Sequence, residues 1–328
     1  MGRRARGVTL GAGGGRDASP ARAPDRVGGC LALFPGMAAA FPGMGRPLAG
    51  RPAAARVFAE FGRWSRLDVA GAAATATAEE LFRDRTWELA VVATQAAALA
   101  AWQEAGNAVA ASLGFSIGAY AALLSAGALS VEQAVAIIDV VLEASRRLPG
   151  RYAMAALTGT APDTVAPLLQ PGRTDVAAVV APGQLLIAGT EADVRALAET
   201  LTPEALGVRV LAVRWPLHTP LMLPVAEELE RRRDRLGGLR PFRHPVYSAL
   251  HGGRIETPEE GWRLLVDHLY RPQRFDLAFA AARSDGLRRC VELGPAGALK
   301  RAVRWLARDE VAVEAFPGGA PPARGDRS

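Results

Sequence analysis

A serine between two glycines is the part of this chain best suited to chemistry. Residues 114–118 read Gly-Phe-Ser-Ile-Gly and centre on Ser116. The apolar run at 108–113 predicts a short buried strand before them, and the Ala- and Leu-rich run at 119–126 predicts a helix after them. Small flanking residues permit a tight turn that exposes the hydroxyl, and the helix directs N–H groups towards a developing oxyanion. The pattern therefore predicts that Ser116 is a nucleophile.

A serine nucleophile needs a general base, and the chain has 4 histidines. His218 follows a predicted strand at 208–213 and opens a predicted helix, which places it where loops gather over the carboxyl edge of an α/β sheet. A neutral imidazole there can accept the serine proton and return it to a leaving group. His244 and His251 flank a predicted Pro-Val-Tyr strand and are interpreted as structural. The residues alone leave His268 open.

Length and composition are typical of a sizeable cytoplasmic enzyme. The chain has 328 residues, of which 50% are hydrophobic, enough to bury a substantial core. Its 2 cysteines cannot form a disulfide framework or a metal cluster, so neither is predicted. No apolar run reaches the roughly 18 residues needed to span a membrane. Residues 1–28 lack the apolar segment of a signal peptide and are predicted to be a disordered extension, as are residues 317–328.

The net charge of +6 raises the question of nucleic acid. Most of that charge lies in the two predicted tails, which leaves the body nearly neutral. The body also lacks interleaved aromatic and basic residues, so no nucleic-acid partner is predicted.

Several motifs together resemble the malonyl-CoA:acyl-carrier-protein transacylase family, which includes the acyltransferase domains of polyketide synthases. The resemblance covers about residues 31–316, and the matching segments follow the family order. They are residues 33–37 with 42–45, Thr94-Gln95, 114–120, 152–159, 181–189, 218–222 and 292–295.

The resemblance implies an α/β fold with two domains. An α/β-hydrolase-like large domain would span residues 29–149 and 221–316. A ferredoxin-like small domain, residues 150–220, would be inserted into it and deliver His218 near its end. Independently, the alternation of apolar strands with Ala-rich helices predicts an α/β protein with a mainly parallel sheet.

The resemblance also implies a two-step transfer. Ser116 would attack the phosphopantetheine thioester of CoA or an acyl carrier protein, with His218 as base, and a second nucleophile would then take the acyl group. The phosphopantetheine arrives as substrate, so no permanently bound cofactor is expected. In the family pattern the backbone N–H groups of Ile117 and Met37 form the oxyanion hole. The backbone carbonyl of His268 would orient His218, so no third carboxylate is nominated.

One departure from the family bears on the substrate. In malonyl-transferring members an arginine lies fourteen residues beyond the glycine that ends the nucleophile's helix, and it binds the free carboxylate. Counting from Gly127 places that position at Val141. A malonyl carboxylate buried against valine would be unpaired, which costs several kcal/mol. Malonyl and methylmalonyl groups are therefore expected to be poor substrates.

Other positions expected at the acyl pocket are also apolar. Phe115 and Val180 stand where the family often shows histidine and asparagine, Trp215 and Leu217 lie where malonyl-specific members show H-A-F, and Gln95 belongs to the same predicted pocket. Together they predict a site for a neutral and even bulky acyl group.

The leading hypothesis is therefore an acyltransferase that moves a neutral acyl group from an acyl-CoA or acyl-carrier-protein thioester to a carrier protein or a small-molecule acceptor, in specialised polyketide-type biosynthesis. Two alternatives remain open. The chain could be an editing hydrolase that strips acyl groups from carrier proteins, with water as the acceptor. It could instead be a non-catalytic docking module for carrier proteins, for which basic patches such as residues 231–233 offer a surface.

Overall fold

Two β-sheets organise the chain. A computed structural model describes residues 29–83, 85–202, 205–211, 213–295 and 297–317. The extension predicted at 1–28, and all but the first residue of the predicted tail, lie outside the described residues.

The first sheet has six strands in the order β11-β10-β1-β2-β7-β8. All neighbouring pairs are parallel except β7 with β8, which is antiparallel. Its strands are β1 (Cys30–Phe34), β2 (Val109–Gly114), β7 (Val246–Ser248), β8 (Arg254–Ile255), β10 (Arg289–Leu293) and β11 (Ala312–Phe316).

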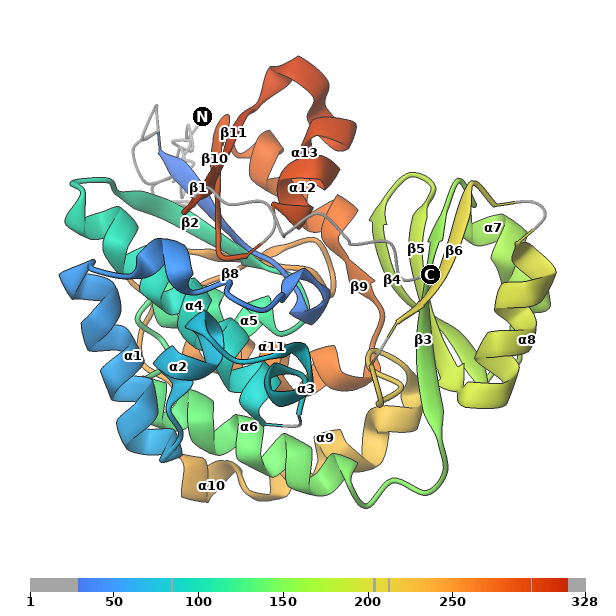
Figure 1. Ribbon diagram of the computed structural model, residues 1–328. Coiled ribbons are helices and arrows are strands. Elements are labelled where there is room, and N and C mark those ends of the chain that lie inside the picture. Colours follow the sequence, from blue (N-terminus) through green and yellow to red (C-terminus); the bar gives the residue numbers. More distant parts are fainter. Residues whose placement is uncertain (1–28, 84, 203–204, 212, 296, 318–328) are drawn as a thin grey trace, which may run out of the picture.

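Both faces of this sheet are covered, as a mostly parallel sheet requires. In β1, Leu31 and Leu33 belong to a core cluster with side chains of α12 and α13, whereas Ala32 and Phe34 belong to a second cluster with side chains of α4 and α5. Figure 1 shows these two pairs of helices on opposite sides of the strands. The continuous apolar sequence of β1 follows from burial on both faces.

The second sheet lies beside the first, at the right of Figure 1, with α7 and α8 on its outer side. Its order is β6-β3-β5-β4-β9, and every pair is antiparallel except β4 with β9. Its strands are β3 (Tyr152–Thr158), β4 (Thr174–Ala181), β5 (Gln184–Thr190), β6 (Gly207–Leu211) and β9 (Gln273–Arg274). The short β9 comes from the segment that was assigned to the large domain, so that segment contributes an edge to the second sheet.

The helices connect and cover the two sheets. The α-helices are α1 (Pro52–Ser65), α2 (Val69–Ala74), α3 (Ala78–Leu81), α4 (Thr86–Glu104), α5 (Gly118–Ser125), α6 (Val131–Ser145), α7 (Pro162–Val165), α8 (Glu191–Leu201), α9 (Leu223–Arg231), α10 (Arg233–Leu236), α11 (Pro258–Tyr270), α12 (Phe275–Ser284) and α13 (Ala298–Ala307). The 3₁₀ turns are η1 (Met37–Ala39), η2 (Arg46–Leu48), η3 (Ala166–Leu168), η4 (Pro220–Met222) and η5 (Arg308–Glu310). Across the described ranges, none of these helices combines the length and the apolar character needed to cross a membrane.

The helix predicted to open at His218 begins later in the structure. Thr219 is extended, with φ −126° and ψ 160°, and η4 precedes α9. The cause is Pro220, since a proline disfavours the helical conformation of the residue before it. His218 therefore lies in the loop before η4 and not in a helix.

Gly118 is required by close packing of α5 against β1. A Cβ atom at this position would lie 2.1 Å from the carbonyl oxygen of Phe34. We therefore expect Gly118→Ala to lower the free energy of unfolding by about 1–3 kcal/mol or more, because a packed backbone must move. Denaturant titration measures this, with Gly238→Ala as control, since a Cβ there meets nothing within 4 Å. Equal stabilities of the two variants would contradict the expectation.

Candidate active site

Ser116 lies at a sharp turn between β2 and α5. Its φ is +56°, a left-handed conformation that is uncommon for a residue with a side chain. The two flanking glycines explain how the turn closes, since a Cβ on Gly114 would lie 2.3 Å from the Gly118 carbonyl oxygen. The hydroxyl is thus held at the N-terminal end of α5, where the helix dipole favours negative charge.

His218 contacts this hydroxyl directly. Its Nε2 lies 2.8 Å from Ser116 Oγ, and its Nδ1 hydrogen-bonds to the backbone carbonyl of His268. The carbonyl can only accept, so Nδ1 carries the proton and Nε2 is free to accept one from the serine. The backbone N–H of His218 also donates to the Leu269 carbonyl at 2.7 Å. The ring is therefore fixed in the tautomer that a general base needs.

Both carbonyls belong to the last turn of α11, where helix carbonyls have no partner within the helix. His218 satisfies two of them and lies at the negative end of the helix dipole, which favours a positive charge on the imidazole. The orienting group is therefore a backbone carbonyl rather than a carboxylate.

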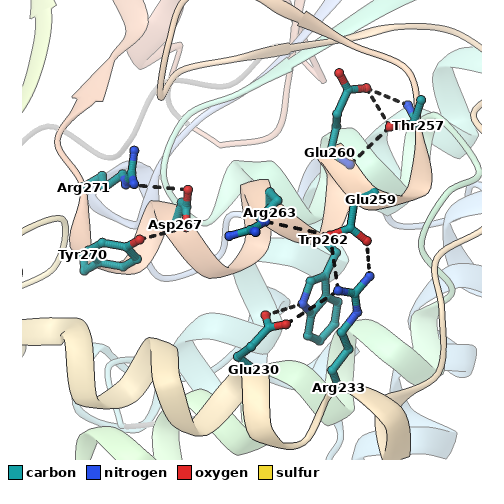
Figure 2. Close-up of polar contacts among 10 residues, drawn as sticks. All are labelled: Glu230, Arg233, Thr257, Glu259, Glu260, Trp262, Arg263, Asp267, Tyr270 and Arg271. Atoms are coloured by element: carbon teal, nitrogen blue, oxygen red, sulfur yellow. Dashed lines mark hydrogen bonds and ion pairs between the residues drawn. The ribbon is translucent and has the colours of Figure 1, made fainter.

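Polar contacts fix α11 along its length, as Figure 2 shows. Thr257 and Glu260 form a capping box at its start, and Trp262 Nε1 donates to Glu230 Oε2 of α9 at 2.7 Å. At its end, Tyr270 Oη donates to Asp267 at 3.0 Å. Since these contacts restrain the helix at both ends and against α9, the carbonyls that hold His218 have a defined position.

Burial determines the protonation state of the base. His218 is 2% exposed, and desolvation lowers its pKa to about 4. The hydrogen bond to the His268 carbonyl opposes this shift but does not cancel it. The His218 imidazole is consequently neutral at neutral pH, as proton acceptance from Ser116 requires.

This pKa predicts an unusual acid limit for Ser116 acylation. Because only the neutral imidazole accepts a proton, we expect the loading rate to be constant from pH 8 to about pH 5, to halve near pH 4 and to fall below it. Single-turnover loading after brief pH jumps measures the profile. The exposure to acid must be brief because the fold loses stability there. The cause is that burial lowers the pKa values of His218, His244 and His268. Below about pH 6.5 the unfolded chain binds protons that the folded chain does not, so stability falls. A midpoint near pH 6.5 for the loading rate would contradict the assignment.

Two backbone amides beside the serine are available to bind an anion. Met37 begins η1 after β1, and Ile117 is the N-cap of α5. Among the backbone hydrogen bonds between described residues, none is donated by either of these N–H groups. Both residues also line the cavity that contains Ser116. The loop before Met37 is held by Gln95, whose Nε2 donates to the Pro35 carbonyl at 2.6 Å.

A mostly apolar cavity opens beside the Ser116 hydroxyl. Its volume is about 60 Å³. Its apolar wall comes from Met37, Ile117, Ile138, Val141, Leu142, Trp215, Leu217 and Leu269, and its polar lining from Glu88, Ser116, Tyr120, Ser145, His218 and His268. None of these described lining residues is a lysine or an arginine.

The acyl transferase domain profile matches residues 32–319 of this chain. The chain belongs to the acyl transferase domain family. The chain is 30% identical to the malonyl CoA-acyl carrier protein transacylase of Bacillus subtilis, over 84% of this chain and 90% of that protein. It is also 30% identical to erythronolide synthase EryA3 of Saccharopolyspora erythraea, over 88% of this chain. The chain spans only 9% of that much longer synthase.

Solved structures give the same result. The acyltransferase domain from the second module of the salinomycin polyketide synthase superposes with a TM-score of 0.78 and 30% identity, covering 87% of this chain and 68% of that one. A malonyl-transacylase solved with its type II acyl-carrier protein superposes with a TM-score of 0.82 at 24% identity, over 89% and 96% of the two chains, and supports the fold alone. The chain is thus an α/β enzyme of the acyltransferase class.

Three of the six residues predicted for the acyl pocket line the cavity in the structure. Val141, Trp215 and Leu217 line it. Phe115 and Val180 are not among its described lining residues and pack into the core cluster on the other face of the first sheet. Phe115 meets Phe275 there edge to face, with ring centroids 6.1 Å apart. Gln95 is also not among the described lining residues, since it is fully buried and its Nε2 donates to the Pro35 carbonyl.

Sequence reasoning missed several lining residues. Ile138, Leu142 and Ser145 lie on the same face of α6 as Val141, at spacings of three and four residues, so extending the helical stripe from Val141 would have found them. Glu88 had a weaker signal, because it is the one charged residue in an otherwise uncharged stretch from 86 to 103. Tyr120 and Leu269 neighbour residues that were already nominated.

His244 and the two cysteines are not among the described residues that line the cavity. His244, interpreted as structural, hydrogen-bonds through Nε2 to Oγ of Ser112, a residue of β2, at 2.9 Å. Cys30 and Cys290 are buried and free. Among the described residues, no group of three or more His, Cys, Asp or Glu side chains could hold a metal ion.

Proposed function

We propose that this chain transfers an acyl group from a CoA or carrier-protein thioester to a second acceptor through an acyl-enzyme on Ser116. The observation that carries the proposal is the contact of 2.8 Å between Ser116 Oγ and His218 Nε2, with Nδ1 held by a backbone carbonyl. Membership of the acyl transferase domain family supports the same chemistry.

Each residue has one role in this reaction. His218 Nε2 accepts the Ser116 proton as Oγ attacks the thioester carbonyl, and the Ile117 and Met37 amides bind the resulting oxyanion. When the tetrahedral intermediate collapses, the carbon–sulfur bond breaks and His218 returns the proton to the leaving thiolate. The acceptor then attacks the seryl ester by the reverse sequence. The His268 carbonyl keeps the imidazole oriented in both steps.

We further propose that the donor carries no carboxylate. A malonyl tail entering the cavity would meet Val141 and no cation on the described walls. Leaving that charge unpaired costs several kcal/mol, which is enough to exclude the donor. The relative from Bacillus subtilis is named for malonyl transfer, so donor selectivity is where this chain is proposed to differ.

The cavity favours a short acyl group. Its volume of about 60 Å³ is small for a ligand pocket. This volume supports an acyl chain of a few carbons and does not favour the bulky acyl group that the sequence also allowed.

The finer architecture is part of the same proposal. In chain order the strands β3, β4, β5 and β6 alternate with helices in a β-α-β-β-α-β pattern, which supports a ferredoxin-like domain at 150–220 inserted into an α/β-hydrolase-like domain at 29–149 and 221–316. The acceptor is proposed to be an acyl carrier protein, because relatives are named for that partner. Its setting is proposed to be polyketide-type biosynthesis, in keeping with the synthases among the relatives.

Weighing the intact protein after incubation with malonyl-, acetyl- and butanoyl-CoA tests the proposal. We expect a mass gain from acetyl or butanoyl donors, a much smaller one from malonyl, and retention of the adduct until a holo carrier protein is added. Rapid release of free acid without an acceptor would instead identify an editing hydrolase. No adduct with any donor would identify a non-catalytic docking module.

A further inference from the structure

A carboxyl group lies on the wall of the acyl cavity. Glu88 is in the first turn of α4, a helix whose following residues are almost entirely buried. The side chain is 8% exposed and lines the same cavity as Ser116. Its charge is one of the causes that raise the pKa of Tyr120, another lining residue. The Glu88 carboxyl therefore belongs to the interior of the site.

A second polar group faces the same space from a different helix. Ser145 ends α6, one turn beyond the lining residues Val141 and Leu142. It is 0% exposed, and its Oγ has no hydrogen-bond partner among the residues that the structure describes. A buried hydroxyl without a partner is costly unless a ligand or water satisfies it. Two helices thus each bring one oxygen-bearing side chain to an otherwise apolar cavity.

These two groups define the chemistry that the cavity can bind. A carboxylate accepts hydrogen bonds, and a hydroxyl accepts and donates them. An ammonium group donates three hydrogen bonds and carries the charge opposite to that of a carboxylate. A carboxylate on the substrate would meet the like charge of Glu88, whereas an alkyl group would offer no hydrogen bond to the Ser145 hydroxyl.

We propose that the preferred donor is a short amino-acyl thioester whose amino group binds between Glu88 and Ser145 while its carbonyl is attacked by Ser116. This inference rests on the proposed acyltransferase function and names the substrate class. Glu88 also interacts with other groups of the protein. The inference depends on where the carboxyl lies and on the charge it brings, not on its being unpartnered.

Matched pairs of donors isolate the amino group. The 3-aminopropanoyl thioester has the same number of non-hydrogen atoms as the butanoyl thioester, and the 3-aminobutanoyl thioester corresponds to the 3-methylbutanoyl thioester. We expect the wild-type chain to load each amino-acyl group on Ser116 at least about tenfold faster than its alkyl counterpart, as N-acetylcysteamine thioesters at pH 7. Glu88→Gln keeps the shape and removes the charge, and is expected to abolish or reverse that preference. Ser145→Ala is expected to reduce it.

The readout is the ratio of the two loading rates, which a general loss of folding or activity does not change. Glu60→Gln, an exposed position on α1, serves as the matched charge control and should keep the wild-type ratio. Loading of butanoyl but not 3-aminopropanoyl by the wild type would overturn this inference and leave the acyltransferase proposal standing. Absence of loading by every donor would overturn the acyltransferase proposal itself. A preference unchanged in Glu88→Gln would show that Glu88 does not bind the amino group.

Discussion

Ser116→Ala is expected to yield no acyl adduct with any thioester, and to reduce transfer to a carrier protein by at least about 10⁴-fold. The physical reason is that the alanine variant keeps the cavity and the two amides but has no oxygen to form the ester. His218→Ala is expected to slow adduct formation by about 10²–10⁴-fold, since the serine then lacks a general base. Intact mass and single-turnover loading measure both effects.

Matched variants separate chemistry from folding in this prediction. Ser284→Ala and His251→Ala alter exposed positions outside the cavity and should load like the wild type. Thermal melts of all four variants establish that they are folded. An adduct of full mass in Ser116→Ala, at the wild-type rate, would place the nucleophile elsewhere.

Val141→Arg is expected to shift the donor selectivity from acetyl towards malonyl groups. A guanidinium on the cavity wall can bind a malonyl carboxylate, and a hydrogen bond to a charged group contributes about 1.5–3 kcal/mol. Malonyl loading relative to acetyl loading should therefore rise by roughly 10- to 100-fold. Competition between malonyl- and acetyl-CoA, read as the ratio of the two adduct masses, measures the change.

The control for this variant must fill the same space without charge. Val141→Met extends the side chain into the cavity and should not increase the malonyl ratio. The double variant Val141→Arg/Glu88→Gln should load malonyl better than Val141→Arg alone, because Glu88 lines the same cavity and competes for the guanidinium. If Val141→Arg and Val141→Met gave the same ratio, Val141 would not face the acyl group.

The sequence alone was enough to predict the pairing of Ser116 with His218, whose side chains lie 2.8 Å apart in the structure. Gly114, Ser116 and Gly118 form a local pattern, because the tight backbone that it requires is contained within a single turn. The strand predicted at 108–113 and the helix predicted at 119–126 each differ from β2 and α5 by one residue at either end, because their apolar patterns are local properties. His218 was identifiable from its place between a strand and a helix.

Only the tertiary structure decided which side chains line the cavity beside Ser116. Phe115 is adjacent to Ser116 in sequence, yet it points to the opposite face of the first sheet, because neighbouring residues around a strand end project in opposite directions. Glu88 and Ser145 are 57 residues apart in sequence but line one cavity, since side chains of α4 and α6 pack into the same core cluster. Local sequence determines strands, helices and turns. Which charged residues line a cavity depends instead on packing between distant segments, so no short motif predicts it.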